Sequence, residues 1–346
     1  MARELALGLD TFGDVTAGRH PAQVIRDVVE EGVLADSLGV DFFGVGEHHR
    51  PDFAVSAPEV VLAAIAARTS RIHLGTAVTV LSSDDPVRVF ERFATLDAVS
   101  QGRAEIILGR GSFIESFPLF GYDLADYEIL FEEKLDLFVH LLSEEPVTWS
   151  GQTRAALTGQ RVFPPTEAGR IMTWVGVGGS PQSVVRAARH GLALTLAIIG
   201  GEPLRFAPYA DLFRRALAGF GHAAQPIAAH SPGYVADTDE QARDEFWPHY
   251  ATMHARIGRE RGWPPLTRAQ FDVTAGPDGA LFVGSPATVA TKIVTVARGL
   301  GLSRFDLKYS AGTLPHDLCR RAIELYATKV TPLVRDQLVK DERAPS

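Results

Sequence analysis

The chain is poor in cysteine and has no long apolar run. Cys319 is the one cysteine in 346 residues, which excludes an internal disulfide and any zinc or iron–sulfur site built from cysteines. No stretch approaches the roughly 20 apolar residues of a membrane-spanning helix. The first ten residues, MARELALGLD, also lack the apolar segment of a signal peptide. We therefore expect a cytoplasmic protein with no membrane partner.

Positive charge is scarce as well. The 34 basic residues are outnumbered by 42 acidic ones, which gives a net charge of −8, and they form no basic cluster. A nucleic-acid partner is disfavoured, because binding to a phosphate backbone needs a concentrated positive surface. The composition, 46% hydrophobic and 22% charged, is that of an ordinary globular protein that can bury a full core.

What the sequence does contain is a regular alternation of short apolar runs and longer amphipathic stretches. It predicts eight strands, each followed by at least one helix, with short turns at most junctions. The predicted strands are 5–10, 41–46, 72–81, 104–109, 172–177, 192–198, 227–235 and 305–309. The predicted helices are 23–37, 58–68, 86–100, 127–142, 181–190, 204–218, 239–260, 286–299 and 316–329.

This order of elements predicts an α/β fold, a (β/α)8 TIM barrel that forms a single domain over 1–346. A doubly wound parallel sheet is the alternative. Two segments fall outside the repeat and are predicted insertions, a hairpin near 147–166 and a proline- and glycine-rich stretch near 262–280. In such a barrel the functional side chains lie at the C-terminal ends of the strands.

Three polar residues, Glu47, His48 and His49, follow the second predicted strand directly. Burying them without partners would be costly, so a solvated loop at the barrel rim is one explanation. A metal site is disfavoured, because adjacent histidines lack the i, i+4 spacing of a zinc-binding helix. The functional explanation is that one histidine faces the pocket, as an acid–base group or as a stabiliser of negative charge.

Two glycine-containing loops after predicted strands could bind an anion. The first, 109–112, places Arg110 between glycines, from which its guanidinium can reach a phosphate. The second, 176–183, leads into a helix N-terminus with partial positive charge and offers the hydroxyls of Ser180 and Ser183. A surface turn and a simple helix cap are the alternatives. The second loop matches a dinucleotide fingerprint only loosely, so we interpret the pair as a site for a phosphorylated cofactor.

Longer stretches of the sequence resemble the bacterial luciferase-like family of flavin-dependent oxidoreductases and monooxygenases. The similarity covers nearly the whole chain and is densest across 41–144. The family fold is a (β/α)8 barrel with insertions, and its cofactor is usually FMN, although a large branch uses the deazaflavin F420. The stretches that carry the similarity are GVGEHH (44–49), IHLGTAVTVLSSDDPVRVFERFATLDAVSQGRAEIILGRGSF (72–113), FGYD (120–123), WVGVGGSPQSVVRAARHGL (174–192) and LFVGSPATVATKI (281–293).

The resemblance implies roles for individual residues. His48 matches the catalytic histidine of luciferase, and the bond between Ala77 and Val78 matches a non-prolyl cis peptide beneath the flavin ring. No counterpart of luciferase's reactive cysteine is present, and light emission is not implied, because most family members emit none. The residues implied to contact the flavin phosphate are Arg110, Gly178, Gly179, Ser180 and Ser183, with the two glycines replacing an acidic residue of luciferase.

We therefore expect an FMN-dependent monooxygenase that uses reduced FMN and O2 to oxidise a small organic molecule. One alternative is an F420-dependent dehydrogenase or reductase, and the other is a flavin-binding protein without catalytic activity. A general-base role for His48 predicts a rate that rises with pH near ~6.5.

The expected partners are the small-molecule substrate, a flavin reductase unless hydride is transferred directly, and a second copy of the chain. The homodimer is implied by the resemblance and would use the alanine-rich helix at 57–68. The groups expected to shape substrate specificity are Phe12, Phe53, Phe113, Trp174 and the two insertions.

Overall fold

The computed structural model describes residues 5–16 and 18–342. Its centre is a parallel sheet in the order β3-β2-β1-β12-β10-β9-β8-β5-β4. The sheet curls until its ends meet, with Leu74 of β3 paired in parallel with Ala104 just before β5. Because β3 and β4 are two pieces of one barrel strand, the described chain forms a nearly closed (β/α)8-type barrel. The predicted barrel is confirmed, and the doubly wound alternative is wrong.

The strands lie close to their predicted positions. The barrel strands are β1 (Ala6–Thr11), β2 (Phe42–Val45), β3 (His73–Thr76), β4 (Thr79–Val80), β5 (Glu105–Gly109), β8 (Met172–Val177), β9 (Ala193–Ala197), β10 (Ile227–Val235) and β12 (Arg304–Lys308). A short strand, β11 (Phe282–Gly284), adds to β10 outside the main order.

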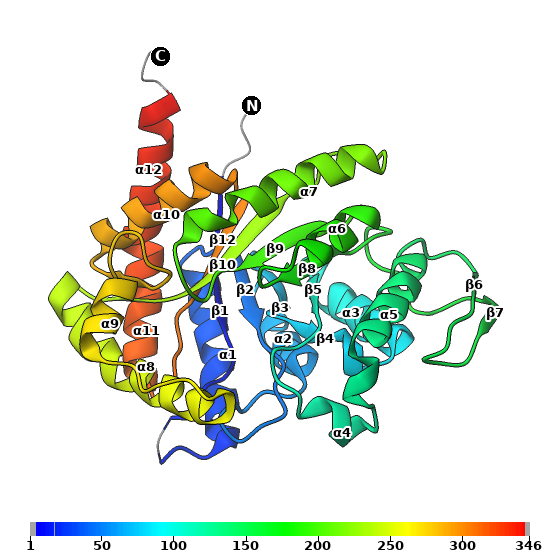
Figure 1. The fold of residues 1–346 in the computed structure, drawn as a ribbon, viewed down its shortest axis with the longest axis horizontal. Helices are drawn as coiled ribbons and strands as arrows, with labels where there is room; N and C mark the ends of the chain where they lie inside the picture. The colour runs from blue at the N-terminus through cyan, green and yellow to red at the C-terminus, as the bar shows by residue number, and fades with distance from the viewer. Residues whose placement is uncertain (1–4, 17, 343–346) are drawn as a thin grey trace.

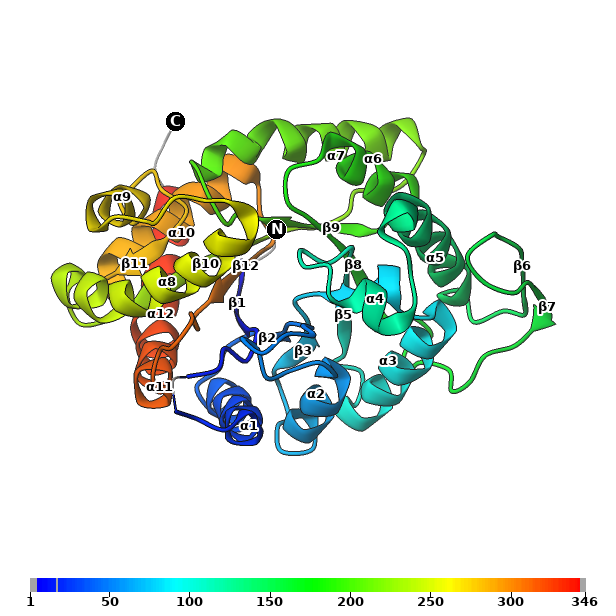
Figure 2. The same ribbon diagram turned by 60° about the horizontal axis from the view of Figure 1, so that its bottom comes forward.

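The helices cover the outside of the barrel, as Figures 1 and 2 show. Five of them have proline as their first residue, where its fixed φ suits the helix and its missing N–H is not needed. These five are α1 (Pro21–Ser37), α2 (Pro58–Ala66), α3 (Pro86–Ser100), α6 (Pro181–Arg189) and α10 (Pro286–Leu300). The others are α4 (Ser116–Phe120), α5 (Tyr127–Leu141), α7 (Ala207–Gly219), α8 (Asp239–Arg261), α9 (Arg268–Thr274), α11 (His316–Leu325) and α12 (Thr331–Glu342).

The structure corrects three of the predicted elements. The third strand is interrupted after Thr76 and ends in a 3-10 turn at Leu81–Ser83. The last helix does not end at 329, because a π-helical turn, Tyr326–Val330, joins α11 to α12. The stretch 262–280 is not structureless, since Thr267 caps α9 with a reciprocal side-chain–backbone pair that the sequence analysis missed.

The predicted hairpin at 147–166 is present as an antiparallel pair, β6 (Val147–Trp149) and β7 (Leu157–Gln160). It projects beyond α5, at the right-hand edge of Figures 1 and 2, away from the barrel. No helix among the described residues combines the length and apolarity needed to cross a membrane.

The main apolar core lies between the strands and the surrounding helices. Inside the barrel the apolar cluster is small, and a buried arginine lies beside it: the Arg304 guanidinium is 3.9 Å from the Phe42 ring centroid. Arg304 donates to Glu105 at 2.6 Å and to Asp306 at 3.0 Å. We call Glu105, Arg304 and Asp306 the interior ion cluster. Charge therefore occupies part of the barrel axis, and each charge has an opposite partner.

Candidate active site

A cavity of about 350 Å³ lies at the C-terminal end of the barrel strands. This is the end at which barrel enzymes place their reacting groups. Much of its wall is apolar, which suits a flat organic ring. The apolar lining residues are Phe12, Ala77, Val78, Val80, Ile107, Phe113, Val177, Ala197 and Ile199.

His48 lies in this cavity inside a cage of phenylalanine rings. Its ring centroid is 4.3 Å from Phe53, 4.7 Å from Phe12 and 5.4 Å from Phe113. The Nε2 atom is buried and has no hydrogen-bond partner among the described residues. Burial in this apolar cage lowers the pKa of His48 to about 3. The imidazole is therefore neutral at physiological pH, and the expected pH dependence near 6.5 is not supported.

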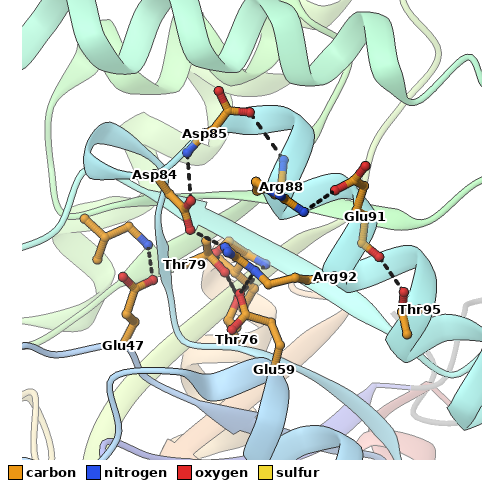
Figure 3. A network of polar contacts seen from close by, with 12 residues as sticks. Glu47, Glu59, Thr76, Thr79, Asp84, Asp85, Arg88, Glu91, Arg92 and Thr95 are labelled. Atoms are coloured by element: carbon orange, nitrogen blue, oxygen red, sulfur yellow. Dashed lines mark hydrogen bonds and ion pairs between the residues drawn. The ribbon is translucent and has the colours of Figure 1, made fainter. Parts of the chain in front are cut away.

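Glu47 and His49 also line the cavity, but both carboxylate oxygens of Glu47 already bind other groups of the protein. Its Oε1 lies 2.9 Å from His49 Nε2, and its Oε2 accepts a hydrogen bond from the backbone N–H of Val80 at 2.8 Å. Figure 3 shows the second of these contacts. The Glu-His-His sequence thus contributes one histidine with an unpaired nitrogen, His48, and a carboxylate–histidine pair that fixes the neighbouring strand.

The segment after β3 is anchored from several sides. The Ala77–Val78 peptide bond is cis, as the resemblance implied. Val78 fits because Gly109 has no side chain, since a Cβ there would lie 2.4 Å from Val78 Cγ2. Further along, Arg92 of α3 binds both Asp84 and Glu59 (Figure 3). Ala77 and Val78 are therefore held at the cavity wall by packing and ion pairs.

The predicted anion-binding residues meet at one end of the same cavity. Arg110, Gly178 and Ser183 line it. Ser180 is the N-cap of α6, accepting from the Ser183 backbone N–H, and Gly179 adopts a φ of +116° that L-residues rarely take. Ser180 and Gly179 do not line the cavity, so their contribution would come through the shape of the loop.

Two charged residues that the sequence analysis missed complete this end. The Glu128 carboxylate binds both Arg110 and the Arg186 guanidinium, the latter at 3.1 Å. Arg186 also donates to the Ser183 hydroxyl at 3.4 Å. The spacing of Ser183 and Arg186, three residues apart on α6, was a usable signal. We call Arg110, Ser183 and Arg186 the anion end; Arg110 and Ser183 line the cavity, whereas Arg186 lies behind Ser183 and is paired with both Glu128 and Glu132.

An arginine bridge closes one side of the cavity. Arg50, after β2, donates to Glu115 in the loop after β5 at 2.7 Å and to Glu260 of α8 at 2.6 Å. Its guanidinium also lies 4.2 Å from the Phe113 ring centroid. Near the same ring, Arg261 donates to the Ser112 backbone carbonyl at 2.7 Å. The long helix α8 thereby fixes the aromatic side of the cavity, although it contributes no lining residue itself.

The residues expected to shape specificity are only partly at this cavity. Phe12 and Phe113 line it, and Phe53 reaches it through His48. Trp174 lies at the opposite end of the barrel interior, where its indole N–H donates to Glu105 at 2.8 Å. No residue of the insertions 147–166 and 262–280, all of which the structure describes, lines the cavity.

The profile of the family described as luciferase-like monooxygenase matches residues 6–304. The chain belongs to this family.

Several curated relatives are similar to parts of this chain. The 4-hydroxyprotoasukamycin monooxygenase of Streptomyces nodosus subsp. asukaensis is 30% identical, over 72% of this chain and 69% of its own length. The alkanal monooxygenase alpha chain of the Kryptophanaron alfredi symbiont is 28% identical, over 67% and 66%. An uncharacterized protein of Sinorhizobium fredii, y4vJ, is 30% identical over 49% and 48%. The chain thus spans about half to two thirds of the length of these relatives.

Solved structures with the same fold include enzymes of both cofactor types. Monooxygenase RslO1 from Streptomyces bottropensis superposes with a TM-score of 0.82 at 23% identity, over 95% of this chain and 99% of that one. The oxygenating constituent of 3,6-diketocamphane monooxygenase from Pseudomonas putida, in complex with FMN, gives 0.78 at 19% identity, over 95% and 99%. An F420-dependent secondary alcohol dehydrogenase gives 0.75 at 15% identity, over 96% and 100%. At these identities the similarity shows the fold.

The cavity contains several unpaired polar atoms. Six of its lining residues carry a buried side-chain oxygen or nitrogen without a partner among the described residues. Buried polar groups are normally paired, so this concentration in one cavity indicates a polar ligand. The atoms are Asp10 Oδ1, His48 Nε2, Glu115 Oε2, Ser116 Oγ, Thr195 Oγ1 and Asp306 Oδ1. Among the described residues, no three His, Cys, Asp or Glu side chains are arranged so that they could hold a metal ion.

Proposed function

We propose that this chain is an FMN-dependent monooxygenase that oxidises a small organic molecule with O2. The observation that carries the proposal is the division of one cavity into three parts. At the anion end, Arg110 and Ser183 line the cavity and Arg186 donates to the Ser183 hydroxyl, which is chemistry suited to a phosphate. The middle is apolar, and the far side holds the neutral imidazole of His48.

The described residues fit FMN. Its phosphate would be held by the anion end, and its ring system would lie along the apolar wall that includes Val78 and Ile107. The polar edge of the ring both donates and accepts hydrogen bonds, which matches the unpaired oxygens and nitrogen of the cavity. Bound in its reduced form, FMN supplies the electrons for oxygen activation. His48 would accept a hydrogen bond through its unpaired Nε2.

Two measurements, cofactor binding and turnover, distinguish this proposal from two other functions. The dehydrogenase with the same fold is F420-dependent, and a flavin-binding protein without catalysis would use the same cavity. The purified chain is titrated with FMN and with F420 and followed by visible absorption. Oxygen consumption is then measured with reduced FMN. Tight FMN binding and oxygen-dependent turnover are expected; selective F420 binding, or FMN binding without turnover, contradicts the proposal.

We further propose a cytoplasmic location and a supply of reduced FMN from a separate reductase or by direct hydride transfer. The test is whether an added NAD(P)H:flavin reductase increases the rate of oxygen consumption. If NAD(P)H without the reductase supports the same rate as NAD(P)H with it, hydride is transferred directly to FMN on this chain.

Replacing Glu128 by Gln is expected to tighten FMN binding. Glu128 pairs with both Arg110 and Arg186, so a phosphate must compete with its carboxylate. The carboxylate is 64% exposed, and exposed ion pairs contribute about 1 kcal/mol at most. The expected gain is therefore below about fivefold in Kd, measured by flavin fluorescence. Weaker FMN binding in the variant would show that Glu128 positions the arginines and does not compete with the phosphate.

We also propose a homodimer that uses the helix α2. Val60 on this helix is 69% exposed, an apolar side chain facing solvent in the single chain. Light scattering at micromolar concentration is expected to give about twice the 37.4 kDa chain mass. A Val60→Glu substitution is expected to shift the mass toward one chain. A mass of one chain for the unaltered protein contradicts the dimer.

A further inference from the structure

A second histidine in the cavity, His230, was not singled out from the sequence. His230 lies on β10 and Asp10 on β1, and both line the cavity. Between their strands lies β12, in which Asp306 is the register partner of His230. The His230 Nδ1 atom is 2.6 Å from Asp10 Oδ2, and both residues are buried. Three neighbouring barrel strands therefore bring one imidazole and two carboxylates together on the cavity floor.

The Asp10 contact fixes the orientation of the His230 ring. With Nδ1 directed at a carboxylate, Nε2 is the nitrogen left for a group in the cavity. The Phe12 ring stacks on the imidazole with a centroid distance of 6.0 Å and an interplanar angle of 12°. Gly8 contributes space nearby, since a Cβ there would lie 2.1 Å from Asp306 Oδ1. The arrangement is thus held by packing as well as by the ion pair.

The charges around His230 favour its protonated form. Burial alone would lower the pKa of His230, but the Asp10 carboxylate outweighs burial and raises it. Asp306 and Lys308, both on β12, also face the ring, with opposite effects. Lys308 is itself paired with Asp14 at 2.9 Å. The other flanking strand, β9, contains no titratable residue.

His230 and His48 both lie next to the Phe12 ring and have opposite environments. The Phe12 centroid is 4.7 Å from His48 and 6.0 Å from His230. His48 is enclosed by phenylalanines and stays neutral, whereas His230 is next to a carboxylate. The two histidines can therefore have different roles, with the protonated ring available as an acid and the neutral ring as a hydrogen-bond acceptor.

We propose that His230, oriented by Asp10, is the proton donor of the cavity, while the neutral imidazole of His48 accepts a hydrogen bond and takes up no proton. The assignment of the proton's destination rests on the proposed FMN-dependent oxygenation. In that net reaction, the O–O bond breaks, one oxygen atom enters the substrate, and the other forms water. The two electrons and two hydrogens for the water come from reduced FMN. His230 donates a proton to the departing oxygen and regains the proton lost from the cofactor on oxidation.

The protonation state is tested without cofactor by NMR titration of the histidine rings in the full chain. His230 is identified as the signal lost in His230→Gln. It is expected to titrate above 6.5, the ordinary histidine value, while His48 shows no titration between pH 5 and 8. In Asp10→Asn the His230 midpoint is expected to fall. A midpoint at or below 6.5, or one that Asp10→Asn leaves unchanged, overturns the assignment.

The catalytic part is tested with reduced FMN and a turned-over substrate. His230 loses its proton as the pH rises through its titration midpoint, so the rate is expected to fall in that pH range. His230→Gln is expected to lower kcat by about 10²–10⁴-fold. The variant should also lack this fall in rate at alkaline pH (the alkaline limb), and it should retain its affinity for FMN. His222→Gln, an exposed histidine paired with the Arg189 carbonyl, is the matched control and should be unaffected.

The two proposals fail differently. Loss of FMN binding in the unaltered chain would refute the proposed function, while the NMR titration would still decide the protonation of His230. Normal turnover and an unchanged alkaline limb in a folded His230→Gln would refute the donor alone. Folding of each variant is checked by its Tm, and Asp10→Asn provides a second variant should His230→Gln fail to fold.

Discussion

His48→Ala is expected to lower the oxygenation rate by roughly 5–150-fold while FMN still binds, the effect of leaving a buried donor of the bound ligand without its acceptor (about 1–3 kcal/mol). The imidazole lies at the cavity wall with its Nε2 buried and unpaired, so its removal takes away an acceptor that no neighbour replaces. The phosphate contacts lie at the other end of the cavity and should be unaffected. Stopped-flow turnover with reduced FMN measures the first effect, and flavin fluorescence measures the second.

The pH dependence gives a separate test of His48. Burial lowers the pKa of His48 to about 3, so the neutral form is present at every pH above that value. The rate should therefore show no rise attributable to His48 between pH 5 and 8. If His48→Gln keeps most of the activity, the residue only shapes the cavity. A rise near 6.5 that vanishes in the variant would show that the cage is more polar in solution than its rings indicate.

Arg110→Ala is expected to weaken FMN binding by about 1.5–3 kcal/mol, which is roughly 10–150-fold in Kd. Among the ion pairs of the described residues, Glu128 pairs with two guanidinium groups, those of Arg110 and Arg186. Losing Arg110 removes a charged hydrogen-bond donor from the anion end. The residual affinity should then depend on Arg186, Ser183 and the N-terminus of α6.

Arg88→Ala is a matched control for this experiment. Arg88 is exposed on α3 and pairs with Glu91, away from the cavity lining. Its loss should leave FMN affinity unchanged. Arg110→Lys, which keeps the charge but not the two-pronged donor, should fall between the two. Unchanged affinity in Arg110→Ala would contradict the phosphate assignment, even with FMN bound elsewhere in the cavity.

The barrel could be predicted from the sequence because its signals are local. Short apolar runs ended by polar loops marked the strands, and prolines such as Pro58, Pro86 and Pro181 marked helix starts. The family could be identified from dense stretches such as 72–113. Element ends were less certain, as at 326–330, where a π-helical turn continues a helix expected to stop.

The floor of the site could not be predicted in the same way. Asp10 and His230 are 220 residues apart, and only the closed strand order brings them together. His230 is one polar residue in an otherwise mostly apolar strand, a usable signal that the sequence analysis did not weigh. Glu128 was missed because nothing local shows that a residue at the start of α5 faces an arginine 18 positions earlier. The neutral state of His48 likewise depends on Phe12 and Phe113, which come from other strand ends.

The interior ion cluster has a consequence for how this molecule can change. Apolar packing that holds the fold together is concentrated outside the strands, between sheet and helices, whereas the inside is small, polar and adjacent to the cavity. Inward-facing and outward-facing positions alternate along each strand. A new chemistry could therefore arise by exchanging alternate residues of the strands in charge-balanced sets, with the outer layer left intact. The barrel separates the residues that keep it folded from the residues that could be altered to give it a different substrate.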